Sequence, residues 1–391
     1  MRGVVGRAHS YTRKSMPRTS SHGHHTSAPT GQQRATAILV TGAGGEMGHG
    51  LLEALDARRK RHAECSCGKD HGPAPVIVAM DIRELAPEIA SHCDHAFVGD
   101  ICDHALLERL LAMFEIAEIY HLAALLSTRG EFAPETAHQV NVGGTLNLLH
   151  LAAEQARSHG RTVRFFFPSS IAVYGLPDLA TKANAGRVNE GEWCEPQSMY
   201  GCNKLAGEHL GRYYDRHYRS LAKDRIGHPV DFRSIRFPGI ISSDTIPSGG
   251  TSDYGPEMIH AAAAGRPYAC FVRGDSRIPF MTMPEAIEAT LSLMKAPKTS
   301  LTRAVYNISS FSPSADDFAE LVRRAFPSAA ISFEPDAGRQ SIVDSWPTDC
   351  DDAAARADWG WRPVHTVQSA FSEYLLPRIA ARYAPSSHAR A

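Results

Sequence analysis

From residue 36 onward, short apolar runs alternate with longer segments in which apolar residues recur every three or four positions. The runs have the length of buried strands, and the longer segments have the period of helices. This alternation predicts βαβ units and a parallel sheet, whose ligands lie at the C-terminal ends of the strands. In the first half we predict strands at 37–40, 76–80, 96–98, 118–124 and 164–167.

The second half of the chain is less regular. Residues 230–236 alternate and predict a sixth strand, short strands are expected at 304–308 and 330–333, and helices at 258–264 and 315–325. We therefore predict an α/β fold, a Rossmann-type doubly wound parallel sheet with a smaller C-terminal α/β substrate lobe. The NAD-binding part spans 36–238, and 239–391 forms most of the substrate lobe, with interleaved elements.

Two segments of the first half are predicted from local composition. Apolar spacing predicts a helix over 106–114 and an earlier helix that starts near His49. Residues 58–75 are charged and end in a Gly-Pro-Ala-Pro sequence, which predicts an inserted loop.

The first 35 residues are rich in Ser, Thr, His, Arg and Gly, and no acidic residue precedes Glu46. This composition is typical of a disordered tail, and it also fits a mitochondrial transit peptide. Both interpretations stay open, so we expect a cytoplasmic protein, or a matrix protein if the tail is a transit peptide.

The net charge and the length of the apolar runs argue against nucleic acids and membranes as partners. The net charge is −1, and no apolar run approaches the roughly 20 residues that a membrane span needs. We therefore expect neither nucleic-acid binding nor membrane insertion.

The eight cysteines follow no disulfide spacing, which favours free thiols in a reducing compartment. Cys65 and Cys67 lie near His62 and His71, but Cys-x-Cys differs from the usual zinc knuckle. A polar surface insertion is the better interpretation, and we predict no metal site.

The first candidate binding motif is the glycine-rich stretch 41–48, which lies between an apolar run and a helical pattern. In that context Gly42 allows a tight turn, Gly45 admits a pyrophosphate and Gly48 lets the helix pack closely. The second strand ends at Asp81, whose carboxylate can bind both hydroxyls of an adenosine ribose and would repel a 2′-phosphate. The expected cofactor is NAD; Arg83 is the one residue nearby that could favour NADP.

A second pattern follows the predicted fifth strand. Ser170 ends that strand, and Tyr200 and Lys204 have the spacing that places two side chains on one helix face. An ammonium beside a phenol favours the phenolate, which can act as general base on a substrate hydroxyl while Ser170 holds the same oxygen. We expect the positive nicotinamide ring to lower the phenol pKa further.

Together these motifs resemble the extended short-chain dehydrogenase/reductase superfamily, which includes nucleotide-sugar epimerases and dehydratases. The residues that carry the resemblance are Thr41, Gly42, Gly45, Gly48, Asp81, Asp100, 121–124, Asn141, Ser170, Tyr200 and Lys204. Later stretches, at 236–242, 247–254, 344–347 and 358–361, are similar to the short-chain type of L-threonine 3-dehydrogenase. The resemblance covers about residues 36–375; the tail and the 58–75 insertion lie outside it.

The resemblance implies roles for individual residues. The implied cofactor contacts are Gly42, Gly45, Glu46, Met47, Asp81, Asp100, Ile101, Leu122, Ala123, Ala124, Tyr200, Lys204 and Ile240. The implied substrate contacts are Ser127, Ser170, Tyr200, Thr251, Ser252 and Trp346, with Ser170, Tyr200 and Lys204 as the catalytic set. Hydroxyl-rich loops suit a small zwitterion, which needs donors for its carboxylate and acceptors for its ammonium. The family often has Thr where this chain has Ser252.

Structural roles remain open for several of these residues. Trp346 could be a packed aromatic residue, and Thr251, Ser252 and Ser127 could cap loops. Asn141 is expected to satisfy buried backbone groups. The choice of Ser170 over its neighbour Ser169 rests on the resemblance.

The implied activity is NAD-dependent oxidation of the C3 hydroxyl of L-threonine to 2-amino-3-oxobutanoate by an enzyme that is expected to be a homodimer. One alternative is a nucleotide-sugar epimerase or dehydratase, for which Arg266, Arg273 and Arg277 are candidate diphosphate ligands. The other alternative is a non-catalytic NAD-binding protein, against which the intact Ser, Tyr and Lys argue.

Overall fold

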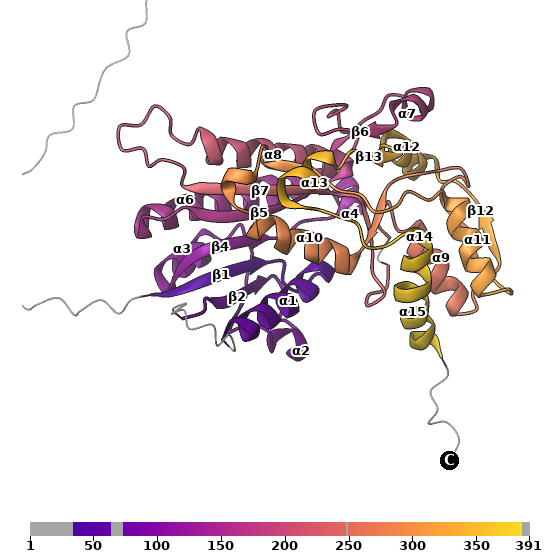
Figure 1. Ribbon diagram of the computed structural model, residues 1–391, viewed down its shortest axis with the longest axis horizontal. Coiled ribbons are helices and arrows are strands. Elements are labelled where there is room, and N and C mark those ends of the chain that lie inside the picture. Colours follow the sequence, from indigo (N-terminus) through magenta and orange to yellow (C-terminus); the bar gives the residue numbers. More distant parts are fainter. Residues whose placement is uncertain (1–33, 64–72, 248, 385–391) are drawn as a thin grey trace, which may run out of the picture. The chain divides into compact units, whose positions relative to one another are not determined.

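A parallel sheet of seven strands forms the core of one of the two lobes of the computed structural model, which describes residues 34–63, 73–247 and 249–384 (Figure 1). Its strands are β1 (Ala35–Thr41), β2 (Val76–Asp81), β3 (His95–Val98), β4 (Phe114–His121), β5 (Val163–Ser170), β7 (Val230–Phe237) and β11 (Val305–Asn307). They are ordered β11-β7-β5-β4-β1-β2-β3. The direction in which strands are added reverses between β1 and β4, and such a switch point opens a crevice at the C-terminal strand ends.

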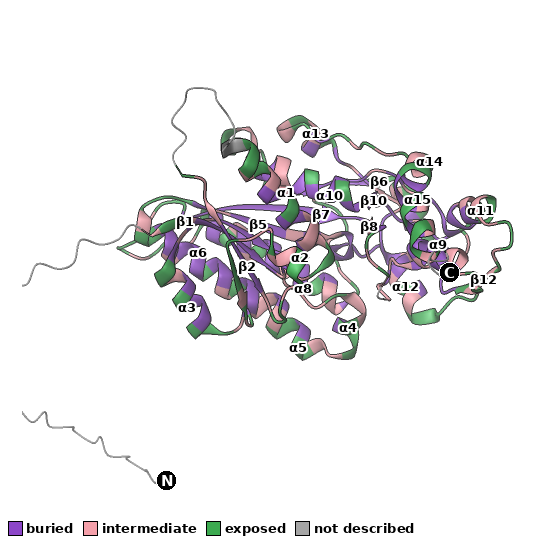
Figure 2. Cartoon of the chain, turned by 90° about the horizontal axis from the view of Figure 1, so that it is seen from below, coloured by how far each residue is buried: buried purple, intermediate pink, exposed green. Residues whose placement is uncertain are grey.

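Helices cover both faces of this sheet. On one face α3 (His104–Met113), α6 (Thr145–His159) and α8 (Met199–Arg216) pack on β4, β5 and β7. On the other face α1 (Glu46–Ala63) and α10 (Met283–Lys295) pack on each other and on the sheet. Figure 2 shows the buried strands between helices whose outer surfaces are exposed.

Alternating side chains of the strands supply the two apolar layers. In β1, Ala37 and Leu39 join the cluster under α3 and α6, whereas Ile38 and Val40 join the cluster under α1 and α10. A strand that is buried on both faces has a continuous apolar run, which is why this segment could be predicted from its sequence.

A third apolar cluster forms the core of the second lobe. Tyr254, Phe280 and Phe318 are fully or almost fully buried there and meet edge to face. The helices around this cluster include η2 (Ile171–Val173), α9 (Tyr254–Ala263), α11 (Ala315–Ala325), α12 (Ala337–Ser345), η4 (Ala370–Leu375) and α15 (Leu376–Tyr383). Two pairs of parallel strands complete it: β8 (Gly239–Ile241) pairs with β10 (Phe280–Thr282), and β9 (Tyr268–Cys270) pairs with β12 (Ile331–Phe333).

The remaining elements are short. They are α2 (Pro87–Ala90), α4 (Ser127–Phe132), α5 (Pro134–His138), η1 (Gln139–Gly144), α7 (Leu179–Ala185), β6 (Arg187–Val188), η3 (Lys298–Ser300), β13 (Asp349–Cys350), α13 (Ala353–Trp359) and α14 (Val367–Ser369).

Several sequence-based boundaries are wrong: the strand expected at 118–124 is Phe114–His121, and the helix expected at 258–264 is Tyr254–Ala263. Helix α1 continues to Ala63 and so includes the first part of the predicted 58–75 loop. Asp56 pairs with Arg59 and with Lys60 one turn later, which stabilises the charged end of the helix. Phe114 begins β4 rather than ending α3, because its ring is buried in the cluster under α3 and α6.

Parts of the second half lie in the central sheet and its cover, since β11 is the edge strand next to β7 and α10 packs on α1. The boundary that we place between residues 238 and 239 stays a prediction. The predicted tail or targeting segment, up to residue 33, and the Cys65–Cys67 pair lie outside the described residues.

The described ranges contain neither a membrane-spanning helix nor a cluster of metal ligands. No helix there is long and apolar enough to cross a membrane. Among the same residues, no group of three or more His, Cys, Asp and Glu side chains has a metal-binding arrangement.

Candidate active site

The glycine-rich loop between β1 and α1 has a backbone that only glycine can form. Gly42 has φ +68°, and a Cβ on it would lie 2.5 Å from the backbone nitrogen of Ala123. A Cβ on Gly48 would lie 2.5 Å from the carbonyl oxygen of Ala43. The loop therefore packs against the end of β4 with its backbone exposed at the N-terminus of α1, where N–H groups favour phosphate oxygens. These features fit a dinucleotide.

Asp81 lies beside this loop at the end of β2. Its Oδ2 accepts a hydrogen bond from the backbone nitrogen of Gly44 at 2.9 Å, and its Oδ1 accepts one from that of Arg83 at 3.1 Å. The carboxylate is thus fixed at the place where an acidic residue binds the adenosine ribose in dinucleotide folds.

The other predicted cofactor residues lie at the same edge of the sheet. Met47, Leu122 and Ile240 are half-buried on one apolar cluster, which brings α1, the end of β4 and β8 together. Ala123 and Ala124 follow Leu122 and are half-buried, Ile101 is buried after β3, and the exposed Asp100 precedes it. Gly45 and Glu46 are exposed at the start of α1.

Ser170, Tyr200 and Lys204 come from neighbouring elements. Ser170 ends β5 and is half-buried, with its Oγ accepting from the backbone nitrogen of Ala172 at 3.1 Å. Tyr200 and Lys204 lie one turn apart on α8, which packs on β5. The Nζ of Lys204 lies 5.4 Å from the ring centroid of Tyr200 and 4.8 Å from that of Phe167.

The ionisation of this pair differs from the sequence-based expectation. Burial raises the pKa of the Tyr200 phenol and lowers the pKa of Lys204 to about 7. In the protein alone, desolvation thus favours the neutral form of both groups, so the ammonium does not by itself lower the phenol pKa.

Ser169 and Ser170 point to different sides of β5. The Ser169 hydroxyl is buried and donates to Glu208 Oε1 at 2.6 Å. Glu208, one turn after Lys204 on α8, also binds Arg236 of β7, with the Arg Nε at 2.8 Å and Nη2 at 2.7 Å. Ser170 therefore does not share the contact with Glu208, and the bonds of Glu208 to Ser169 and Arg236 join α8, β5 and β7.

The predicted substrate residues fall into two groups. The hydroxyls of Thr251 and Ser127 are joined by a hydrogen bond of 3.3 Å, although 124 residues separate them. Ser252 follows and is half-buried. Trp346 follows the last residue of α12 and has 5 % of its surface exposed. It belongs to the cluster against which Tyr200 packs. Its burial gives Trp346 a packing role, so its contact with substrate stays a prediction.

Asn141 fixes the chain just before Ser127. Its side-chain oxygen accepts from the Leu125 nitrogen at 2.7 Å, and its side-chain nitrogen donates to the Leu125 oxygen at 2.9 Å. This geometry is the structural role expected from the sequence.

Sequence reasoning missed one buried histidine at the end of β4. His121 bridges the hydroxyls of Thr41 and Thr145, both at 2.9 Å, and burial lowers its pKa to about 3. A neutral His121 therefore fixes β1 and α6 beside Lys204. The sequence analysis counts His121 in the motif at 121–124, but nothing in that motif indicates its bonds to Thr41 and Thr145.

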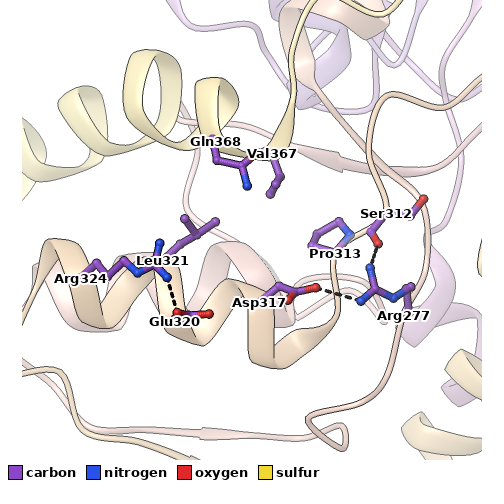
Figure 3. Close-up of a pocket in the computed structure, with 9 residues that line it drawn as sticks. All are labelled: Arg277, Ser312, Pro313, Asp317, Glu320, Leu321, Arg324, Val367 and Gln368. Carbon is purple, nitrogen blue, oxygen red and sulfur yellow. Dashed lines mark hydrogen bonds and ion pairs between the residues drawn. The ribbon is translucent and has the colours of Figure 1, made fainter.

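Two of the three arginines considered for a diphosphate are neutralised by carboxylates. Arg273 binds both oxygens of Asp344 at 2.9 Å, and Arg277 binds Asp317 at 3.0 Å. Arg277 lies in a cavity of about 300 Å³ between α11 and α14, which contains none of the predicted site residues (Figure 3). Arg266 lines another cavity, of about 240 Å³, and has no ion pair within the described ranges.

Comparisons with known proteins identify the family of this chain. The NAD dependent epimerase/dehydratase family matches residues 38–309. A mitochondrial L-threonine 3-dehydrogenase of Bos taurus is 35 % identical over 346 residues, 87 % of this chain and 81 % of its own. An L-threonine dehydrogenase structure from Cupriavidus necator, in its holo form, is 34 % identical with a TM-score of 0.73, covering 88 % of this chain and 99 % of its own.

A structure from a metagenome, described as a monomeric L-threonine 3-dehydrogenase, is also 34 % identical with a TM-score of 0.73, covering 88 % of this chain and 98 % of its own. The family match spans well over half of the 391 residues, and the identities extend over most of each relative. This chain belongs to the NAD dependent epimerase/dehydratase family.

Proposed function

We propose that the protein is an NAD-dependent L-threonine 3-dehydrogenase. The observation that carries this proposal is the place of Tyr200 and Lys204 one turn apart on α8, which packs on the strand that ends at Ser170. The Ser127–Thr251 hydroxyl pair, which joins two distant segments, adds to it. The relatives that match most of the chain and are named L-threonine 3-dehydrogenases support it.

In the proposed reaction, Tyr200 takes the proton of the C3 hydroxyl and Ser170 holds the oxygen as it becomes a carbonyl. NAD, when bound, supplies the hydride acceptor for the C3 hydrogen and a positive ring that favours the phenolate. A protonated Lys204 close to Tyr200 would favour the phenolate, although burial opposes this charge and lowers the pKa of Lys204 to about 7. The products are 2-amino-3-oxobutanoate and NADH.

We assign recognition of the amino acid to hydroxyl groups. Ser127, Thr251 and Ser252 offer donors to the carboxylate and acceptors to the ammonium of a small zwitterion. Trp346 would close the site from the second lobe.

Formation of NADH from NAD and L-threonine, followed at 340 nm, tests the proposal. Tyr200→Phe should lose turnover by several orders of magnitude and keep its NAD affinity, because the phenyl ring preserves the packing but accepts no proton. Near-normal turnover in Tyr200→Phe would refute the mechanism.

Product analysis with a UDP-hexose tests the alternative, because epimerisation leaves no net NADH. The pairing of Arg273 with Asp344 and of Arg277 with Asp317 weighs against a diphosphate site. Turnover of any of these substrates would exclude a non-catalytic NAD-binding protein.

We further propose a homodimer. Phe132 on α4 and Tyr213 on α8 have 85 % and 44 % of their surfaces exposed, so these helices offer apolar groups to a second copy. One relative is described as monomeric, so light scattering on the eluting protein is the deciding measurement.

For the compartment, we propose the mitochondrial matrix if the N-terminal segment is cleaved and the cytoplasm otherwise. The acid-poor composition before Glu46 and the mitochondrial relative support the first outcome. Sequencing of the mature N-terminus distinguishes the two.

A further inference from the structure

The chain at residues 249–252 is held from two sides by side chains outside the predicted site. The Gly249 carbonyl oxygen accepts a hydrogen bond of 2.7 Å from Thr128 Oγ1 on α4. The Gly250 carbonyl oxygen accepts one of 2.7 Å from Arg339 Nη2 on α12, and the same nitrogen lies 3.4 Å from the Gly249 oxygen. A helix beside the sheet and a helix of the second lobe thus meet at two adjacent carbonyls.

Arg339 is placed to make this contact strong. It is half-buried, and its guanidinium lies over the ring of Phe271, which is 8 % exposed. A guanidinium that stacks on an aromatic face keeps a fixed orientation, and partial burial strengthens its hydrogen bond to a carbonyl. No other side chain competes for its Nη2 within the described residues.

The segment itself needs such anchors. Gly249 has φ +86°, and adjacent glycines lose more conformational entropy on ordering than other residues do. Asp253 closes the turn, because its Oδ2 accepts from the Gly250 nitrogen at 2.6 Å. Thr251 lies within this turn, directly after the two bonded carbonyls, and its hydroxyl is 3.3 Å from that of Ser127.

We propose that Arg339, together with Thr128, is a positioning residue that fixes the Thr251 and Ser252 hydroxyls for the substrate. Arg339 lies on α12, and Trp346 directly follows the last residue of that helix, so one helix connects the position of Trp346 to the loop. The inference rests on the proposed function, because it assigns to these hydroxyls the binding of the amino acid.

Arg339→Met tests this inference, since the Met side chain keeps the packing on Phe271 and removes the donors. We expect KM for L-threonine to rise about tenfold, with kcat within about twofold and the Kd of NAD unchanged, because uniform binding of substrate and transition state is lost. Arg339→Lys keeps a charged donor group but not the planar guanidinium, so its KM should lie between those of the wild type and Arg339→Met. The matched control is Arg323→Met, which removes a bond of 3.1 Å from an exposed arginine to the Ile331 oxygen in the same lobe.

Hydrogen exchange in the NAD complex without substrate is the second readout. Arg339→Met should accelerate exchange of the amides of 249–253 and leave the amides of the central sheet unchanged. An unchanged KM would overturn the proposal, as would a parallel loss of kcat, NAD affinity and global protection, which would indicate a general structural role. If the wild-type protein does not oxidise L-threonine, the proposed function fails, and exchange at 249–253 alone then decides whether Arg339 holds the loop.

Discussion

Removing the charge of Glu208 should destabilise the protein strongly. Glu208 is fully buried and accepts two hydrogen bonds from Arg236, one from Ser169 and one from Arg212. It neutralises Arg236, which is 1 % exposed. Glu208→Gln leaves a buried guanidinium without its counter-charge, which costs about 3–5 kcal/mol. For roughly 350 folded residues this corresponds to a decrease in Tm of about 4–7 °C. Urea unfolding of the NAD-free protein, followed by circular dichroism, measures the free energy directly.

A double variant separates the ion pair from the packing around it. Glu208→Leu with Arg236→Met removes both charges and retains apolar volume, so it should recover most of the stability lost in Glu208→Gln. Arg236 Nη1 also donates to the Tyr174 hydroxyl and the Glu190 carbonyl, both at 3.0 Å, and these acceptors could compensate its charge. If Glu208→Gln lowers the free energy of unfolding by less than about 1 kcal/mol, these two acceptors compensate the charge of Arg236, and the expected cost of about 3–5 kcal/mol is wrong.

Three further predictions concern the cofactor edge of the sheet. Burial holds the pKa of Lys204 at about 7, below the value near 10.4 of an unfolded chain. Between these two pH values the unfolded state binds one proton more than the folded state at this residue, so the free energy of unfolding should rise with pH. Urea unfolding of the NAD-free wild type should therefore show a gain relative to Lys204→Met from pH 7 to pH 9, and parallel curves would contradict this. Asp81→Asn keeps an acceptor for Gly44 but loses the charge, so fluorescence titration should give an NAD Kd about ten- to hundredfold higher, with weaker discrimination against NADP; an unchanged preference would place the ribose elsewhere. Gly42→Ala should abolish NAD binding because its Cβ would lie 2.5 Å from the Ala123 nitrogen, whereas Gly143→Ala, whose Cβ meets nothing within 4 Å, should bind normally.

Local motifs were predictable because each depends on residues close in sequence. Gly42 to Gly48 form one strand–turn–helix unit, and Tyr200 and Lys204 share a helix face whatever the rest of the chain does. The strands β1, β2 and β5 are buried on both faces, which leaves a continuous apolar signal.

Contacts between distant segments were not predictable. Arg339 and Gly250 are 89 residues apart, and β8 and β10 have three residues each, too few for a period to emerge. The ionisation of Tyr200 also depends on burial by elements from both halves, so the sequence predicted the pair but not the direction of its pKa in the protein alone. The end of α1 was missed because a run of basic residues was interpreted as a loop, although Asp56 has the spacing to pair with Lys60.

The edge position of β11 has a consequence for how the chain folds. This strand pairs with β7 about 70 residues after β7 has been synthesised, and only then is the main-chain edge of β7 covered. Until that point β7 has unpaired backbone groups that could join another chain, and the pairing closes a long loop, which slows folding. Ribosome-bound chains that stop before residue 305 should therefore depend on chaperones more than chains that extend past residue 307.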